Sequence, residues 1–143
     1  MGAGLAGVGA VAWLIALSVY DVRQRRLPNW LTLPGAVVIL AAAALHGRGV
    51  AAALGAVALF TVYAVVHVMM PTAMGAGDVK LAIGIGALTG FFGRDVWLVA
   101  ALGAPMLTAV LAAVALLCRS GGSVPHGPSM SLAAMSAAAL AVF

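Results

Sequence analysis

Six apolar runs, separated by short polar segments, account for most of the chain. They cover residues 3–20, 30–45, 50–70, 79–92, 96–117 and 129–143. A helix needs about 20 predominantly apolar residues to cross the hydrocarbon core of a bilayer. The first, third and fifth runs approach or exceed that length, and the other three are shorter. The pattern predicts an all-α fold of about six transmembrane helices, in a single domain over residues 1–143.

The amino-acid composition places these helices in a membrane rather than in a soluble core. Hydrophobic residues make up 65% of the chain and charged residues 7%, and the mean hydropathy is +1.20. That composition leaves too little polar surface to coat a soluble protein of this size. We therefore predict a polytopic integral membrane protein whose surroundings are the lipid bilayer.

The remaining composition narrows the possible ligands and partners. The single cysteine, Cys118, rules out an internal disulfide and a paired-cysteine zinc or redox site. The seven lysines and arginines are too scattered to line a nucleic-acid groove. We expect no metal, no organic cofactor and no nucleic-acid partner. A high content of Ala and Gly suits tight helix packing in a monomer or in a dimer, so the oligomeric state stays open.

The positive charges predict how the helices are oriented. The densest basic segment, residues 23–26, follows the first run, and the positive-inside rule assigns it to the cytoplasm. About six crossings then put both termini outside. Most of the basic residues fall on the cytoplasmic side in this arrangement. They are Arg23, Arg25, Arg26, Lys80 and Arg119, against Arg48 and Arg94 outside.

Asp21 and Asp78 are two of only three acidic residues in the chain. Asp21 ends the first run and Asp78 precedes the fourth, so the two intervening crossings return the chain to the same membrane face. Carboxyl groups are costly at the edge of a membrane segment, and both are therefore functional candidates. The third acid, Asp95, falls on the opposite face beside Arg94 and is interpreted as a solvated loop charge.

Two close carboxyl groups can hydrolyse a peptide bond. They cannot easily both ionise, so they share a proton, and one acts as base and the other as acid. The base takes a proton from an attacking water while the acid protonates the carbonyl oxygen. Gly75 and Gly77 remove side chains just before Asp78 and let a peptide or a neighbouring helix come close. Lys80 is expected either to tune the Asp78 carboxylate or to anchor its helix at lipid phosphates.

The residues around this pair leave a second class of function open. A small proton-coupled transporter would relay protons through a membrane carboxylate, although such acids lie near the bilayer midplane rather than at its edge. Asn29, after Pro28, is expected to cap the second helix. His67 is interpreted as a buried or interhelical hydrogen-bonding residue rather than a ligand. The short second, fourth and sixth runs predict a thinned bilayer or a water-filled recess that reaches the aspartates.

Three segments, in this order, carry a resemblance to a known family. Asp21 is followed by basic residues and by Leu27-Pro28-Asn29. Residues 75–81 read Gly-Ala-Gly-Asp-Val-Lys-Leu, and residues 125–128 read Pro-His-Gly-Pro ahead of the last run. Together they resemble the type IV prepilin peptidases, which are membrane aspartic proteases of the GxGD class.

The resemblance implies an aspartic endopeptidase, a hydrolase that removes the short basic leader of type IV prepilin-like precursors. It implies that Asp21 and Asp78 are the catalytic pair, and that the site faces the cytoplasm from a multi-pass protein in the inner membrane of a bacterium or archaeon. The residues that it implies as site-shaping or substrate-binding are Pro28, Asn29, Gly75, Gly77, Lys80, Pro125, Gly127 and Pro128.

The chain departs from the family pattern in two places. Larger members carry an N-terminal region with paired CxxC motifs that is associated with methylation of the new N-terminus. Nothing comparable precedes the first run, so the chain resembles the small protease-only form found with Flp-type pili. His126 stands where an aromatic residue is usual. A non-catalytic subunit of the pilus-assembly machinery stays open as an alternative, and Tyr20-Asp21 also fits the signal-peptide-peptidase-like proteases.

Overall fold

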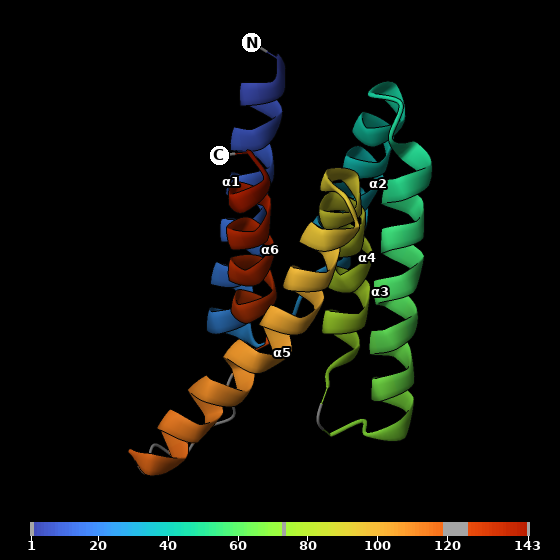
Figure 1. Ribbon diagram of the computed structural model, residues 1–143. Coiled ribbons are helices and arrows are strands. Elements are labelled where there is room, and N and C mark those ends of the chain that lie inside the picture. The colour runs from blue at the N-terminus through green and yellow to red at the C-terminus, as the bar shows by residue number, and fades with distance from the viewer. Residues whose placement is uncertain (1, 73, 119–125, 143) are drawn as a thin grey trace.

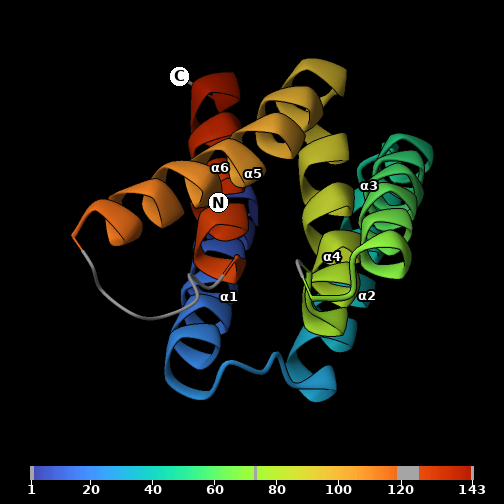
Figure 2. The same cartoon turned by 90° about the horizontal axis from the view of Figure 1, so that it is seen from below.

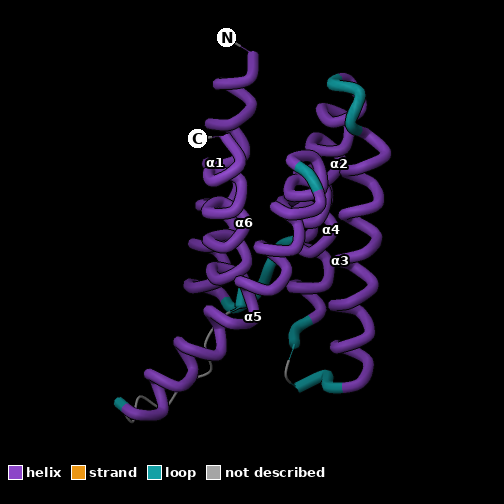
Figure 3. The backbone as a smooth tube through the Cα atoms, viewed as in Figure 1, coloured by secondary structure: helices purple, strands orange, loops and turns teal. Residues whose placement is uncertain are grey.

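The computed structural model describes residues 2–72, 74–118 and 126–142, which fold into helices joined by short turns (Figure 1 and Figure 3). Each helix overlaps one of the predicted apolar runs, so the all-α prediction is confirmed for these residues. In chain order the helices are α1 (Gly2–Gln24), α2 (Asn29–Leu45), α3 (Gly49–Met69), α4 (Ala76–Phe92), α5 (Arg94–Leu117) and α6 (Gly127–Val142).

The helices differ in whether they are long and apolar enough to span a bilayer. Within the described residues, α3 and α5 are long and apolar enough to cross a membrane, whereas α2 and residues 128–140 of α6 form shorter apolar helices. The polar ends of α1 and α4 extend beyond the apolar runs. α1 continues through Asp21 to Gln24, and α4 begins at Ala76, ahead of Asp78. Both aspartates are therefore held on a helical turn rather than in a loop.

α4 is the central helix of the structure. It packs against α2, α3, α5 and α6, while α1 packs mainly against α6 and only lightly against α2. Viewed from below, α1 and α6 stand on one side and α2, α3 and α4 on the other, with α5 crossing toward both (Figure 2). Among the described helices, α1 and α4 do not pack backbone against backbone. Side chains must therefore fill the space between them.

Glycines allow α3 and α4 to pack closely. A Cβ added to Gly86 would lie 2.9 Å from the Cα of Ala56, and one added to Gly55 would lie 2.9 Å from the Cα of Gly90. Real side chains do not approach a backbone so closely, so these glycines bring the two helix backbones into direct contact. The indole nitrogen of Trp97, on α5, donates a 3.0 Å hydrogen bond to the carbonyl oxygen of Gly55. This bond joins α5 to the same contact.

Trp13 fills much of the space between α1 and α4. Its indole nitrogen donates a 2.8 Å hydrogen bond to the carbonyl oxygen of Leu31 on α2. Its ring lies over Gly84 of α4, where an added Cβ would come within 2.5 Å of the ring, and over Gly35 of α2. One large side chain from α1 thus contacts both α2 and α4, which a glycine at each position makes possible.

Candidate active site

A recess of about 330 Å³ opens at the end of the molecule where α1 ends and α4 begins. Both predicted aspartates line it, together with three of the residues expected to shape the site. The full lining is Asp21, Arg25, Arg26, Leu27, Gly75, Ala76, Gly77, Asp78 and Lys80. The fold thus brings the first and second motif segments, residues 21–29 and 75–81, to one opening.

The segment before α4 fixes the position of Asp78. Gly75 has an extended backbone, with φ −75° and ψ 152°, and the helix starts at the next residue. Asp78 lies in the first turn, where the partial positive charge of the helix N-terminus favours a carboxylate. A Cβ at Gly77 would lie 3.2 Å from the Cβ of Leu27, tighter than most real contacts. Glycine at 77 therefore lets the start of α4 approach the segment that follows α1.

Asp21 is held by the last turn of α1 and is buried, with 8% of its surface exposed. The amide of Arg25 donates a 2.9 Å hydrogen bond to the carbonyl oxygen of Asp21. Arg25 has φ 51°, a left-handed conformation that costs a non-glycine residue about 1–2 kcal/mol. This residue ends the helix and turns the chain toward Leu27, which is buried at the recess.

The two carboxyl groups influence one another. Asp78 stands just ahead of the apolar run 79–92, and the pKa of its carboxyl is raised from 3.8 to about 6. Burial is the main cause and the charge of Asp21 the second, while a backbone hydrogen bond at Gly75 opposes the rise. Asp21 and Asp78 thus line the same recess, and the charge of Asp21 disfavours the ionised form of Asp78.

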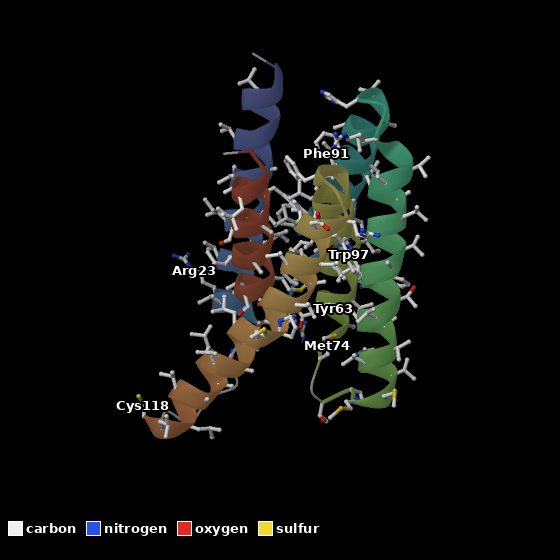
Figure 4. All side chains as sticks on the ribbon, in the orientation of Figure 1. Arg23, Tyr63, Met74, Phe91, Trp97 and Cys118 are labelled. Carbon is white, nitrogen blue, oxygen red and sulfur yellow. The ribbon has the colours of Figure 1, made fainter. Side chains whose placement is uncertain are left out.

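Basic side chains complete the recess. We interpreted the arginines after Asp21 as topology signals, yet Arg25 and Arg26 also line the recess, whereas Arg23 projects from the outer side of α1 (Figure 4). Lys80 donates a 2.8 Å hydrogen bond from its Nζ to Oδ1 of Asn29. This bond connects the Leu-Pro-Asn segment with the first turns of α4.

The expectation that Asn29 caps α2 is wrong. The cap position is held by Pro28, whose backbone is extended with φ −69° and ψ 136°, and no side chain caps the helix. Asn29 is instead the first helical residue, and its side chain accepts the hydrogen bond from Lys80. The proline ring already fixes the φ angle needed to enter the helix, so the asparagine side chain is available for a contact between helices.

A family model for the type IV leader peptidase family matches residues 8–140. The chain belongs to this family. The match includes both segments that form the recess and the segment before α6. Searches of curated proteins and of solved structures found no significant match. Membership of the leader peptidase family makes the chain a protease of that kind, and the family together with two apolar helices of spanning length indicates a membrane protein.

The third motif segment of this leader peptidase does not reach the recess. Pro125 lies outside the described residues, while Gly127 and Pro128 form the start of α6. None of the described residues of this segment is part of the recess lining. His126 is instead bound by two side chains, the hydroxyl of Tyr63 at 2.9 Å and the hydroxyl of Thr108 at 2.6 Å. The segment thus connects α6 with α3 and α5.

Two apolar members of the motif segments line the recess although they were not predicted as site residues. They are Leu27 and Ala76, and small and apolar residues are common throughout the chain. His67 is predicted to be a buried or interhelical hydrogen-bonding residue. It is half-buried, and its Nδ1 donates a 2.6 Å bond to the carbonyl oxygen of Met74, in the segment leading to Gly75. His67 lies near the end of α3, so this bond joins the end of α3 to Met74, which precedes α4 and is labelled in Figure 4.

Proposed function

We propose that this leader peptidase is an aspartic endopeptidase in which Asp21 and Asp78 activate water. The observation that carries the proposal is the recess that Asp21 and Asp78 both line, with the charge of Asp21 raising the pKa of Asp78. A pair coupled in this way retains one proton over a range of pH. That single-proton state supplies an acid and a base at the same time.

The raised pKa of Asp78 suggests how the pair divides the work. Asp78 holds the shared proton and Asp21 is ionised. Asp21 takes a proton from water as the water oxygen bonds to the scissile carbonyl carbon, and Asp78 gives its proton to the carbonyl oxygen. The tetrahedral diol then collapses as Asp78 takes back a proton from one hydroxyl. Asp21 passes its proton to the amide nitrogen, the carbon–nitrogen bond breaks, and the pair returns to its starting state.

The substrate is proposed to be a type IV prepilin-like precursor of the Flp type, cut at the cytoplasmic face of the inner membrane. Gly75, Ala76 and Gly77 leave the backbone beside Asp78 uncovered by large side chains, which suits an extended peptide. The excess of basic residues near the recess end supports a cytoplasmic location for the site.

A lipid environment is part of the same proposal. Large apolar side chains are exposed along the outer faces of the helices, and such a surface is stable in a bilayer but not in water. On α3 alone they include Val50, Leu54, Val57, Val62, Val65 and Val68. We propose that the helices cross the membrane several times, with α3 and α5 as the longest spans.

Co-expression with the prepilin-like precursors of the same genome tests the proposal. Wild type is compared with Asp21→Asn and Asp78→Asn, and the mass of each precursor reports cleavage. Asp95→Asn is the matched control, because it makes the same chemical change in the third acid, an exposed residue in the first turn of α5. Cleavage by wild type and the control, with loss in both other variants, is expected. Cleavage by either of those variants, or no cleavage of any precursor, would overturn the proposal.

A further inference from the structure

The two aspartates belong to different groups of helices. Asp21 is on α1, which packs mainly on α6, whereas Asp78 is on α4, which packs most closely with α3 and α2. The backbones of α1 and α4 are not in contact within the described residues. α6 also packs on α4, and Trp13 joins α1 to α2 and α4, so the separation of the two carboxyl groups depends on these contacts together with the way α6 is held against α3.

A chain of three polar side chains joins these groups. Tyr63 of α3 contacts Nε2 of His126 at 2.9 Å, and Nδ1 of His126 contacts the hydroxyl of Thr108 on α5 at 2.6 Å. His126 immediately precedes α6. Tyr63 is 4% exposed and shares a core cluster with Val79 and Leu81, the neighbours of the Asp78 turn.

One placement of protons satisfies every hydrogen bond in this chain. The Thr108 hydroxyl donates its proton to the carbonyl oxygen of Ala104 at 3.0 Å. Thr108 then accepts from His126, with the proton of His126 on Nδ1. Nε2 is then the acceptor for the Tyr63 hydroxyl. Every donor in the chain has an acceptor when His126 is neutral, and burial lowers the pKa of His126, which favours that neutral form.

We propose that Tyr63, His126 and Thr108 form a polar clasp that sets the separation of Asp21 and Asp78, with His126 as a positioning residue. The predicted effect of the clasp on activity rests on the proposed function, whereas its predicted effect on the positions of the helices does not. Breaking it removes the polar link between α6 and α3 and leaves the α1–α6 pair held by helix packing and by the bond from Trp13 to Leu31, so the pair is expected to shift relative to α3 and α4.

The geometry is tested by pulsed electron-spin distance measurement on the full chain in lipid nanodiscs. Spin labels are attached to cysteines placed at Val22 on α1 and Val68 on α3, which are 58% and 79% exposed, after Cys118→Ser removes the exposed native thiol. Wild type is expected to give one narrow distance distribution. His126→Phe keeps a ring beside Tyr63 but removes both hydrogen bonds, and it is expected to lengthen or broaden the distribution. An unchanged distribution in this variant refutes the clasp.

Two threonines provide a matched comparison. The hydroxyls of Thr108 and Thr61 each donate to the carbonyl oxygen four residues earlier, at 3.0 and 2.7 Å. Only Thr108 also accepts a bond from His126. Thr108→Val is therefore expected to change the distances as His126→Phe does, while Thr61→Val leaves them as in wild type. Equal effects of the two substitutions would show that loss of a helix hydroxyl, and not of the clasp, is responsible.

The pH profile of cleavage separates positioning from general destabilisation. The ionisable groups along the clasp are Tyr63, His126 and, beyond Tyr63, Asp78 on α4; α5 contributes the uncharged Thr108. When the carboxyl groups move apart their coupling weakens, so the upper limb of the kcat/KM profile moves to lower pH. The value at the optimum falls roughly 10-fold or more. A uniform loss at all pH values, with an unshifted limb, refutes positioning.

The two proposals fail in different ways. If no precursor is cleaved, proteolysis is refuted, and the distance measurements still decide the clasp. If wild type cleaves and His126→Phe leaves both the distances and the pH profile unchanged, the clasp is refuted and proteolysis stands.

Discussion

The coupling between Asp21 and Asp78 gives a prediction about the pKa of a single group. In wild type the pKa of Asp78 is raised from 3.8 to about 6, mainly by burial and secondly by the charge of Asp21. The shift corresponds to about 3 kcal/mol between the two protonation states. Asp21→Asn removes the charge but keeps the burial. The pKa of Asp78 is therefore expected to fall below 6 and to stay above 3.8.

The small number of acids makes this shift measurable by infrared spectroscopy. The chain has three acidic residues, so in the double variant Asp21→Asn, Asp95→Asn the only acidic side chain is Asp78. With aspartate isotope-labelled at the side-chain carboxyl, the band of the protonated acid reports its titration alone. Asp95→Asn by itself is the control, and it is expected to show two steps, the upper one near 6.

Either of two results would refute the reasoning. If the upper step stays near 6 after Asp21→Asn, the two carboxyl groups are too far apart to interact, and the aspartic pair is wrong. If the step falls to the ordinary value of an exposed aspartate, burial contributes nothing and the coupling alone raises the pKa. An intermediate midpoint supports both causes in the order that the structure gives them.

Three further predictions concern stability and the link between motif segments. The folded state binds the Asp78 proton more tightly than the unfolded chain does. The contribution of protonated Asp78 to the free energy of unfolding is therefore fully present below pH 3.8 and is lost as pH rises through about 6. Asp78→Asn should therefore raise the free energy of unfolding at pH 7 by up to about 3 kcal/mol and raise the Tm with it. In thermal scans this increase in Tm should vanish near pH 4, and an increase that is the same at every pH contradicts the prediction. Gly86→Ala, whose new Cβ would lie 2.9 Å from the Cα of Ala56, should cost about 1–3 kcal/mol, whereas Gly9→Ala, with open space around it, should not lower the Tm. Lys80→Met and Asn29→Ala each remove the same hydrogen bond. The double variant should therefore lose no more activity than the less active single variant. Additive losses would show that the two residues support activity independently of this bond.

Much of this protein could be predicted from its sequence because the relevant physics is local. Each apolar run forms a helix where it stands, and the two helices between Asp21 and Asp78 return the chain to one end of the molecule, where both aspartates line the recess. The glycines before Asp78 indicated a turn without side chains, and Gly75 is extended there. These conclusions need only the order of apolar and polar residues.

Only the tertiary structure decided which side chains meet. The rotation of each helix about its axis determines that Arg25 and Arg26 face the recess, that Asn29 bonds Lys80 instead of capping α2, and that Gly55 and Gly86 are the glycines in contact. The chain from Tyr63 through His126 to Thr108 joins residues up to 63 positions apart, with no motif to connect them. In a chain made largely of apolar helices, hydropathy is satisfied by many rotations and neighbours. The choice among them is made by close packing at glycines and by the few polar groups that need a partner.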